Sequence, residues 1–337
     1  MADMNTKALS TTINPRIFRT RFNPIRNLRP DTLSRALDEF DAGRLGTAVR
    51  MFESILRRDD TICGLNLKRK KSISRLECEI VVKEESARAF EHKKILSDFY
   101  DSLEVTNFID RNQTGGLRML ISQMMDSVAM KYAVHKIDFK ERNGKISGSF
   151  QQYPLWLFEN TSGKLRLLEH EKQLGDGIAL EDGQWLITCG DGLMVASAIA
   201  HIFKTLPLKD WLIYCERNGM PGIKATTDAF PNSPQWDSVC DAVADFGTEF
   251  HAVLSQGTNI EAIDVSTRGE LPYPAIIERI DRILCALWRG SDLSTISGNN
   301  QIGASAQWYE STLIEEADAT TISETLNRTI DTHALFN

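Results

Sequence analysis

The spacing of apolar residues near the C-terminal end of the chain predicts two long helices separated by a polar gap. Residues 273–289 carry apolar side chains at helical spacing, at Ile276, Ile280, Ile283 and Leu287. Residues 306–330 repeat the pattern roughly on one face, at Tyr309, Leu313, Ala317, Ile322, Leu326 and Ile330. The gap, residues 290–305, reads GSDLSTISGNNQIGAS and has few large apolar side chains. We therefore expect residues 290–305 to form a loop outside the packed core.

The first half of the chain predicts further helices and one strand. A helix is expected from Asp31, as its N-cap, to Gly43, with Leu33, Leu37 and Phe40 facing inward. A second helix carries Ala48, Met51, Phe52, Ile55 and Leu56 on its apolar face. Alternating apolar residues predict a strand over 73–82, and helical spacing predicts helices over 84–103 and 115–130, the former with Ala87, Phe90, Ile95 and Phe99 inward.

Between residues 131 and 189 the pattern changes to short strands separated by turns. The strand segments are KYAVHKIDF, GKISGSF, YPLWLFE, GKLRLLE and QWLITC, which together predict a small, mainly antiparallel sheet. A long helix follows over 191–218, with Val195, Ile199, Ile202 and Leu206 on its apolar face and a kink expected at Pro207. Residues 219–265 then predict an extended segment, a helix over 234–247 capped by Ser233, and strands over 250–255 and 259–265. The fold class is α+β.

Composition places the chain among ordinary globular proteins. It has 337 residues, of which 42% are hydrophobic and 25% charged. No apolar run is long enough to span a bilayer, and the N-terminus lacks the apolar segment of a signal peptide, so no membrane partner is expected. The six cysteines are widely spaced, without a C-x-x-C pair, and are interpreted as free thiols rather than disulfides or zinc ligands.

The net charge of −7 is unevenly distributed. Residues 1–100 hold 20 Lys and Arg against 14 Asp and Glu, and residues 1–30 are interpreted as a basic arm that orders on a neighbouring surface. The run Lys68–Lys71 could contact nucleic acid, capsid protein or another acidic partner, or blunt the edge of the following strand. An acidic chain does not suit tight, phosphate-neutralising DNA binding, but it is compatible with DNA that moves past without sticking.

Candidate catalytic chemistry is sparse. Gly190-Asp191-Gly192 follows a strand and opens a helix, as a nucleotide-binding turn would, but Val195 occupies the position where that motif needs a small residue. A tight turn with Asp191 as helix cap is the simpler interpretation. The acidic residues Glu315, Glu316 and Asp318 could hold Mg²⁺, although a solvated helix face is the simpler interpretation. His201 is interpreted as a satisfied interface histidine rather than a metal ligand. No metal or cofactor is expected, and the sequence favours an assembly protein over an enzyme.

Several segments of the chain resemble the portal proteins of Mu-like bacteriophages and prophages. The matching blocks cover most of residues 22–330: FNPIRNLRPDTLSRALDEFDAGRL, LKRKKSISRLECEI, GGLRMLISQMMDSVAMKYAVHKIDF, YPLWLFENTSGKLRLL, KTLPLKDWLIYCERNGMPG, RILCALWRGSDLSTIS and ISETLNRTI. No single block is a catalytic signature, and the order and spacing of so many blocks make the resemblance specific.

The resemblance implies a non-enzymatic ring, usually of twelve subunits, at one vertex of the virion capsid. Double-stranded DNA would pass through it without sequence-specific contacts during packaging and ejection. The terminase large subunit would dock on one end, and head-completion or neck proteins would later replace it. Major capsid or scaffold protein would contact the ring, which would assemble in the host cytoplasm. The alternatives are a soluble α+β enzyme that uses the Gly190/Gly192 turn for a nucleotide, and a remnant that acts only as a head or neck interaction protein.

The resemblance also implies a division of the chain into functional regions. These are an N-terminal arm (1–30), a wing (31–190), a first stem helix (191–218), a clip (219–265), a second stem helix (266–289), a tunnel loop (290–305) and an outward helix at the base of a crown (306–337). Related chains usually continue past ISETLNRTI into a wing return and a helical crown, which we expect to be missing from a chain that stops at Asn337.

The candidate functional residues follow from this division. The expected DNA-facing residues of the tunnel loop are Ser294, Thr295, Ser297, Asn299, Asn300 and Gln301. The expected stem and inter-subunit residues are Lys204, Lys209, Ile277, Arg279, Arg282, Leu284 and Trp288, of which the three apolar ones lie off the main apolar stripe. The expected clip residues in contact with the terminase are Lys224, Thr226 and Asp228.

Overall fold

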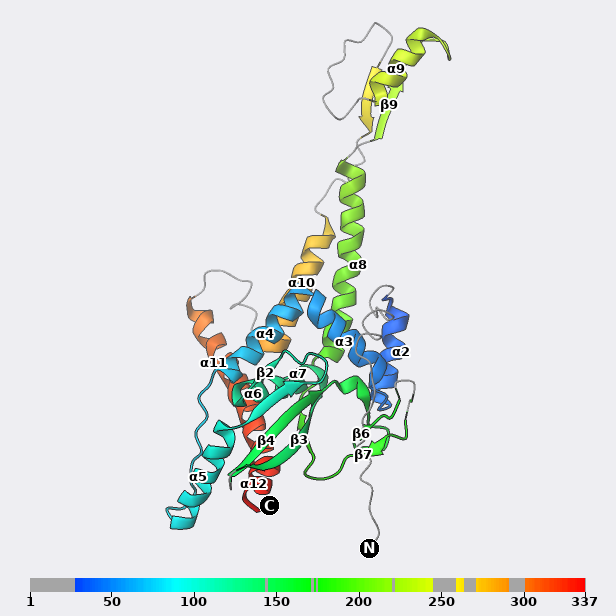
Figure 1. The fold of residues 1–337 in the computed structure, drawn as a ribbon. Coiled ribbons are helices and arrows are strands. Elements are labelled where there is room, and N and C mark those ends of the chain that lie inside the picture. The colour runs from blue at the N-terminus through cyan, green and yellow to red at the C-terminus, as the bar shows by residue number, and fades with distance from the viewer. Residues whose placement is uncertain are drawn as a thin grey trace. The chain divides into compact units, whose positions relative to one another are not determined.

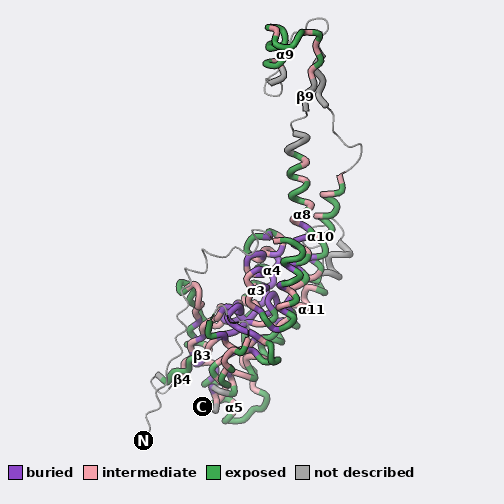
Figure 2. Tube along the Cα trace, turned by 90° about the vertical axis from the view of Figure 1, so that its right-hand side faces the viewer, coloured by how far each residue is buried: buried purple, intermediate pink, exposed green. Residues whose placement is uncertain are grey.

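The computed structural model separates into two compact units, which are described one at a time (Figure 1). It describes residues 28–142, 145–170, 173, 175–219, 222–244, 259–263, 271–290 and 301–336. The first unit comprises residues 1–202 and 280–337, and the second comprises residues 203–279. The tube in Figure 2 shows that buried residues gather in the first unit, whereas the described part of the second unit is mostly intermediate or exposed.

The first unit begins with three consecutive helices, α2 (Pro30–Asp41), α3 (Gly46–Arg58) and α4 (Asp60–Ser74). Helices α2 and α3 confirm the first two predicted helices, including the buried positions Leu33, Phe40 and Phe52. The predicted N-cap is wrong, because Arg29 occupies that position and Pro30 fills the first turn. The turn after α2 requires glycine, since Gly43 has φ +83° and an added Cβ would lie 2.5 Å from the Asn160 backbone.

The predicted strand over 73–82 is wrong. Helix α4 runs on to Ser74, and no strand is assigned over residues 75–82. Only part of that segment reaches a core: Ile73 and Ile80 contact a core cluster, whereas Leu76 is 42% exposed and Val81 is 78% exposed. An alternating pattern makes a stable strand only when a neighbouring strand supplies its hydrogen bonds, and no strand in the described ranges does so here.

Three further helices complete this part of the first unit. They are α5 (Ala87–Asp101), whose first turn is capped by the Ser86 side chain, α6 (Leu117–Met124) and α7 (Asp126–Met130). They confirm the helices predicted over 84–103 and 115–130, the second of which is broken at Met125. The inward face predicted for α5 is partly wrong, because Phe90 and Ile95 are exposed whereas Leu96 and Phe99 are buried.

A five-stranded sheet forms the middle of the first unit, in the order β2-β1-β4-β3-β8. Its strands are β1 (Glu104–Asn107), β2 (Thr114–Gly115), β3 (Tyr132–Arg142), β4 (Lys145–Tyr153) and β8 (Trp185–Cys189). All pairs are antiparallel except β1 with β4, which is parallel. The sheet confirms the mainly antiparallel unit predicted over 131–189, although β1 and β2 were not predicted.

A second, three-stranded sheet joins β5 (Phe158–Glu159), β6 (Arg166–Leu167) and β7 (Ile178–Ala179). The segment YPLWLFE was predicted as a strand, but its centre forms a 3₁₀ helix over Leu155–Leu157. All three residues of that turn are buried, so their uninterrupted apolar run reflects full burial rather than a strand.

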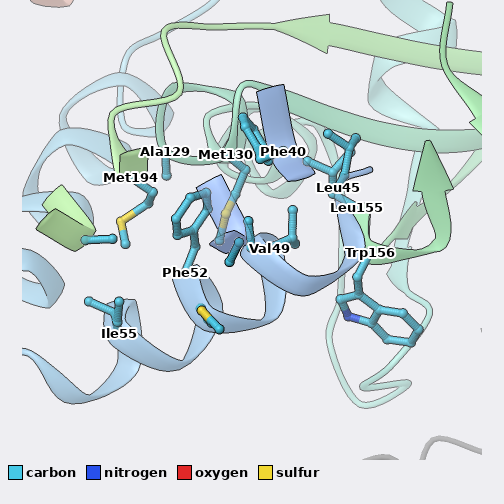
Figure 3. Close-up of a cluster of buried hydrophobic side chains, with 14 of the residues drawn as sticks. Phe40, Leu45, Val49, Phe52, Ile55, Ala129, Met130, Leu155, Trp156 and Met194 are labelled. Atoms are coloured by element: carbon cyan, nitrogen blue, oxygen red, sulfur yellow. The ribbon is translucent and has the colours of Figure 1, made fainter. Parts of the chain in front are cut away.

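The largest core cluster of the first unit lies where α2 and α3 meet the 3₁₀ turn and the start of α8 (Met194–Gly219). Figure 3 shows Phe52 of α3 among Met130, Met194 and Ala129, with Phe40 and Val49 nearby. Phe40 and Phe52 stack edge to face with ring centroids 5.6 Å apart. A second cluster packs α5 and α6 against the sheet and the C-terminal helices.

The C-terminal part contains α10 (Pro272–Arg289), α11 (Gln301–Leu326), a π-helical turn (Asn327–Asp331) and α12 (Thr332–Phe336). The two long predicted helices are therefore confirmed, but their buried faces differ from the predicted ones. In α10, Leu284, Cys285 and Trp288 are buried while Ile276 and Ile283 are exposed. In α11, the predicted Ile322 is buried, but Tyr309 and Leu313 are exposed and Asp318 is buried in addition.

The second unit contains the distal part of α8, the first part of α10, and a small α/β element between them. Helix α8 is continuous through Pro207. Strands β9 (Gly222–Thr226) and β10 (Asn259–Ile263) pair antiparallel, and α9 (Pro234–Ala244) is capped by the Ser233 hydroxyl, which accepts a hydrogen bond from the Trp236 amide at 3.2 Å. These elements confirm the predicted helix and one predicted strand. The strand predicted over 250–255 lies outside the described residues.

Candidate functional site

The two ends of the predicted tunnel loop are well defined in the first unit. Helix α10 ends at Arg289, and α11 begins at Gln301. The predicted loop residues Ser294, Thr295, Ser297, Asn299 and Asn300 lie outside the described residues. Gln301 is the first residue of α11, so the predicted boundary at residue 305 is wrong and residues 301–305 are helical.

A glycine ends α10 in a conformation that other residues rarely adopt. Gly290 has φ +71°, and its amide donates to the Ala286 carbonyl at 2.8 Å. A Cβ at this position would lie 2.9 Å from Cδ1 of Ile314 in α11. The exit of the chain from α10 is therefore fixed directly against α11.

Side chains from two other helices satisfy the last carbonyl groups of α10. The Arg69 Nη1 group of α4 donates to the Trp288 carbonyl at 3.0 Å, and the Ser311 hydroxyl of α11 donates to the Arg289 carbonyl at 3.1 Å. Carbonyl groups at a helix C-terminus lack partners within the helix, and a cation there is favoured by the helix dipole. Arg69 supplies both a donor and a positive charge.

Arg69 is also half of a buried ion pair. Its Nε donates to Oδ2 of Asp318 at 2.7 Å and its Nη2 donates to Oδ1 at 2.9 Å, while Nη2 lies 3.6 Å from Asp191. The side chains of Arg69 and Asp318 are only 7% and 8% exposed. A bidentate pair of this kind fixes the relative orientation of its two helices. We call Arg69, Asp191, the Trp288 carbonyl and Asp318 the loop anchor.

The loop anchor changes the interpretation of two charged segments. Asp318 is neither on a solvated face nor a metal ligand, and Glu315 lies 3.8 Å from Arg289. Within the residues that the structure describes, no three His, Cys, Asp or Glu side chains gather as a metal site. The basic run Lys68–Lys71 lies inside α4 and not before a strand. Of its four residues only Lys68 and Lys71 are exposed, because Arg69 is buried in the loop anchor and Lys70 binds Asp126 at 2.6 Å.

The predicted inter-subunit residues of α10 are corrected by the same packing. Leu284 and Trp288 are 0% exposed, and the Trp288 indole donates to the Ser197 hydroxyl of α8 at 2.9 Å. Neither side chain has surface left for a neighbouring subunit. Ile277 is partly buried and Arg279 and Arg282 are exposed. The exposed apolar side chains of α10 are instead Ile276 and Ile283, at 42% and 52%.

Helix α8 shows a similar rotation of its apolar face. Ile199 and Leu206, predicted to face inward, are 41% and 44% exposed, whereas Ser197 and His201 are buried. Of the predicted stem lysines, Lys209 is exposed but Lys204 is only 7% exposed. The interpretation of His201 as satisfied is confirmed, since its Nδ1 lies 2.7 Å from Asp59, which also caps α4.

The predicted clip residues lie on and after β9. In the backbone register of the two strands, Lys224 lies opposite Glu261. Thr226 and Asp228 are exposed. Their contact with a terminase stays a prediction.

Two amide groups of the turn before α8 are already engaged within the fold. The Gly190 amide donates to the Lys131 carbonyl and the Leu193 amide to the Val128 carbonyl, both at 2.9 Å. An added Cβ on Gly190 would lie 2.5 Å from the Ser127 backbone, so glycine is required for packing. Strand β8 runs antiparallel to β3, unlike a strand of a dinucleotide-binding unit. Gly192 makes the predicted tight turn with φ +71°, but Asp191 does not cap α8, which begins three residues later.

Arg69 is the important residue that the sequence interpretation missed. A signal for it exists, because Arg69 continues the buried positions Ile62, Leu65 and Ile73 of α4 at helical spacing. Asp318 likewise lies four residues from Ile322, which is buried. Opposite charges that each occupy an apolar stripe predict a buried ion pair, since neither is tolerated alone.

Comparison with known proteins supplies the family. Residues 49–337 match the family model described as the portal protein of Mu bacteriophage. No curated protein matches the chain. One similar solved structure is a chain from the neck of an empty gene transfer agent particle, with 9% identity, a TM-score of 0.58, and 83% of this chain and 81% of that chain covered. Another is a chain from the virion of a native gene transfer agent particle, with 9% identity, a TM-score of 0.50, and 81% of this chain and 74% of that chain covered.

A crystal structure of an HK97-family phage portal protein from Corynebacterium diphtheriae is also similar (11% identity, 73% of this chain and 82% of that chain, TM-score 0.38). At such identities the structural likeness concerns the fold, which is mixed helix and sheet. None of the helices in the described ranges is both long and apolar enough to cross a bilayer. The family match over residues 49–337 decides the assignment: the chain belongs to the Mu-type phage portal protein family.

Proposed function

We propose that the protein assembles into a ring at a capsid vertex, in which residues 291–300 line the DNA channel. The loop anchor carries this proposal, because a buried bidentate ion pair and two capped carbonyl groups fix the end of α10 against α11, the two helices that flank one polar segment. Residues 291–300 contain no Lys, Arg or His. Each cationic contact would add phosphate affinity through counterion release, so a loop without cationic side chains suits DNA that must move.

The ring is expected to contain twelve subunits that meet along the stem helices. Helix α8 exposes large apolar side chains that a monomer in water would normally cover, namely Ile199 (41%), Phe203 (61%), Leu206 (44%), Leu212 (62%) and Ile213 (38%). The terminase large subunit and later the neck or head-completion proteins would dock on residues 219–265, where Thr226 and Asp228 are exposed. Capsid or scaffold protein would contact the wing. The role of such a ring is structural.

Electron microscopy of the purified full chain tests the proposal. We expect rings with radial symmetry, and a map in which residues 291–300 face the central channel. The variant Phe203→Asp should stay monomeric, because ring formation would bury its charge between subunits. The matched control Val81→Asp changes a residue that is 78% exposed and lies outside the stem, and it should still form rings. Rings with residues 291–300 on the outer surface, or a wild-type protein that stays monomeric, would overturn the proposal.

A further inference from the structure

A cavity of about 490 Å³ opens in the first unit, away from the loop anchor. Its walls come from α3, α4, α7, the strands β3 and β4, and the segment after β1. The polar and aromatic side chains that matter here are Glu53, Asn66, Asp126, Tyr132, Gln152 and Tyr153. The volume falls within the range of natural ligand-binding pockets.

The floor of the cavity is held in place by a chain of hydrogen bonds. Asp126 accepts from Lys70 at 2.6 Å and from the Gln152 amide at 2.7 Å. The side-chain oxygen Oε1 of Gln152 in turn accepts from the side-chain Nδ2 of Asn107 at 3.0 Å. These contacts satisfy the polar groups of the floor and fix the shape of the cavity before any ligand arrives.

The negative charge of Glu53, on the cavity wall, is only weakly balanced by its ion pair. Its side chain is 27% exposed, and its ion pair with Arg57 spans 3.6 Å. Arg57 itself is 73% exposed, so water screens that pair. Burial raises the pKa of Glu53 to about 7, because Arg57 and Arg50, which lower it, do not offset burial and the nearby Asp126 carboxylate. A carboxyl group in this setting still gains from a further cation inside the cavity.

The N-terminal arm of the chain carries suitable cations. Residues 1–27 contain five basic residues, Lys7, Arg16, Arg19, Arg21 and Arg26, against the single acidic residue Asp3. Arginine suits the cavity better than lysine does, because its planar group can bind a carboxylate and stack on tyrosine rings at the same time. The apolar side chains Ile17, Phe18 and Phe22 are interleaved with the arginines.

The arm also starts close enough to reach. Leu28, the first described residue, packs against the core cluster that contains Val49, Met130 and Leu155, which also line the cavity. Arg21 is seven residues from Leu28, and an extended chain of that length spans about 25 Å. A helix is about 10–12 Å across, so this length suffices to pass around α3.

We propose that the cavity binds an arginine of the chain's own segment Arg16–Arg26, with its guanidinium against Glu53 and its stem between the tyrosine rings. The proposal does not depend on ring formation or on the role of residues 291–300. It assigns the basic arm to a surface of its own subunit.

A native thiol reports on the occupancy of the cavity. Cys63 lines the cavity and is partly buried, whereas Cys78 is exposed and does not line it. We expect reversal of all four arginines (Arg16→Glu, Arg19→Glu, Arg21→Glu and Arg26→Glu) to speed alkylation of Cys63 by iodoacetamide about tenfold, which corresponds to about 1.4 kcal/mol of docking free energy. Mass spectrometry should show an unchanged rate at Cys78. Lys7→Glu, in the arm but outside the segment, should leave both rates unchanged.

A change on the cavity side provides the second measurement. Glu53→Gln should speed Cys63 alkylation as well, while Glu91→Gln on α5 should not. Oxidation of Arg21→Cys with diamide should join it to Cys63 within one chain, as peptide mapping would show. Unchanged Cys63 rates in both the arm and Glu53 variants would overturn the proposal, and so would a cross-link that joins two chains.

Discussion

Arg69 illustrates how one side chain can connect distant parts of a fold. Its guanidinium donates to Asp318 and to the Trp288 carbonyl, and it lies near Asp191, so four chain segments meet at one charged group. A charge this deeply buried is stable only while its partners are present. The loss of either partner should therefore cost far more than the loss of a surface ion pair.

A double-mutant cycle measures this coupling. Arg69→Met and Asp318→Leu should each lower the free energy of unfolding by about 3–5 kcal/mol, because each leaves the other charge buried and unpaired. The double variant should lose less than the sum, with a coupling energy of about 0.5–3 kcal/mol in urea unfolding. The exposed pair Lys93 and Glu79, 3.6 Å apart, is the matched control and should couple by less than about 1 kcal/mol. Equal coupling in both pairs would contradict the prediction.

His135 should make the stability of the first unit depend on pH. The residue is fully buried in β3 and contacts Gln123 at 3.2 Å. Burial lowers the pKa of His135 from 6.5 to about 4, with Asp126 opposing and Lys70 adding to the shift. Between these two pKa values the unfolded chain binds a proton that the folded chain does not, so stability falls as the pH falls from 6.5 to 4.

His135→Gln removes this proton uptake. Relative to the variant, the wild-type free energy of unfolding should therefore fall by up to about 1.4 kcal/mol per pH unit between pH 6.5 and 4. Urea unfolding at a series of pH values checks this. His170→Gln, at an exposed position, should give a curve parallel to that of the wild type. A His135→Gln curve that is also parallel would contradict the assignment.

At the scale of single elements, the sequence predicted where helices lie better than which face they bury. Helix α10 has apolar residues at Ile276 and Ile283 and also at Leu284 and Trp288, so helical periodicity alone allows two faces. The structure buries the second face, because Trp288 finds a hydrogen-bond partner in Ser197 and Arg69 reaches the Trp288 carbonyl. The choice depends on packing partners 91 and 219 residues away, about which periodicity carries no information.

The prediction of strands is limited in the same way, by contacts between residues that are distant in sequence. The hairpin of β3 and β4 could be predicted from alternation and turn residues, since the two strands are close in sequence, and the alternation of β8 predicted a strand although its partner β3 is distant in sequence. The false strand over 73–82 has the same alternation without a neighbour. Strands β1 and β2 were missed because both are short and because β1, which carries β2 at the edge of the sheet, pairs with the distant strand β4 through tertiary contacts.

At the scale of the whole molecule, the charge balance leads to a prediction about DNA. A ring whose channel is lined by residues 291–300 should hold DNA weakly, because these residues carry no positive charge. Ser294→Lys combined with Asn299→Lys should strengthen binding of double-stranded DNA and make it more salt-dependent, by about 0.9 in the log–log slope for each phosphate neutralised. Fluorescence anisotropy over a NaCl series measures both effects.

The control for this experiment places an added lysine elsewhere, and its effect is compared with that of Ser294→Lys alone. Ser162→Lys lies in an exposed turn of the wing and should change neither the affinity nor the slope. Equal strengthening by Ser162→Lys would show that net charge, and not the position of residues 291–300, controls DNA binding.

The sequence separation within the loop anchor has a consequence for protein synthesis. Arg69 and Asp318 are 249 residues apart, so at typical translation rates Arg69 leaves the ribosome roughly 10–50 s before its partner. During that interval the guanidinium must stay hydrated, and α4 cannot settle into its final environment. The orientation of α4 relative to α11 thus becomes fixed only after Asp318 has been synthesised.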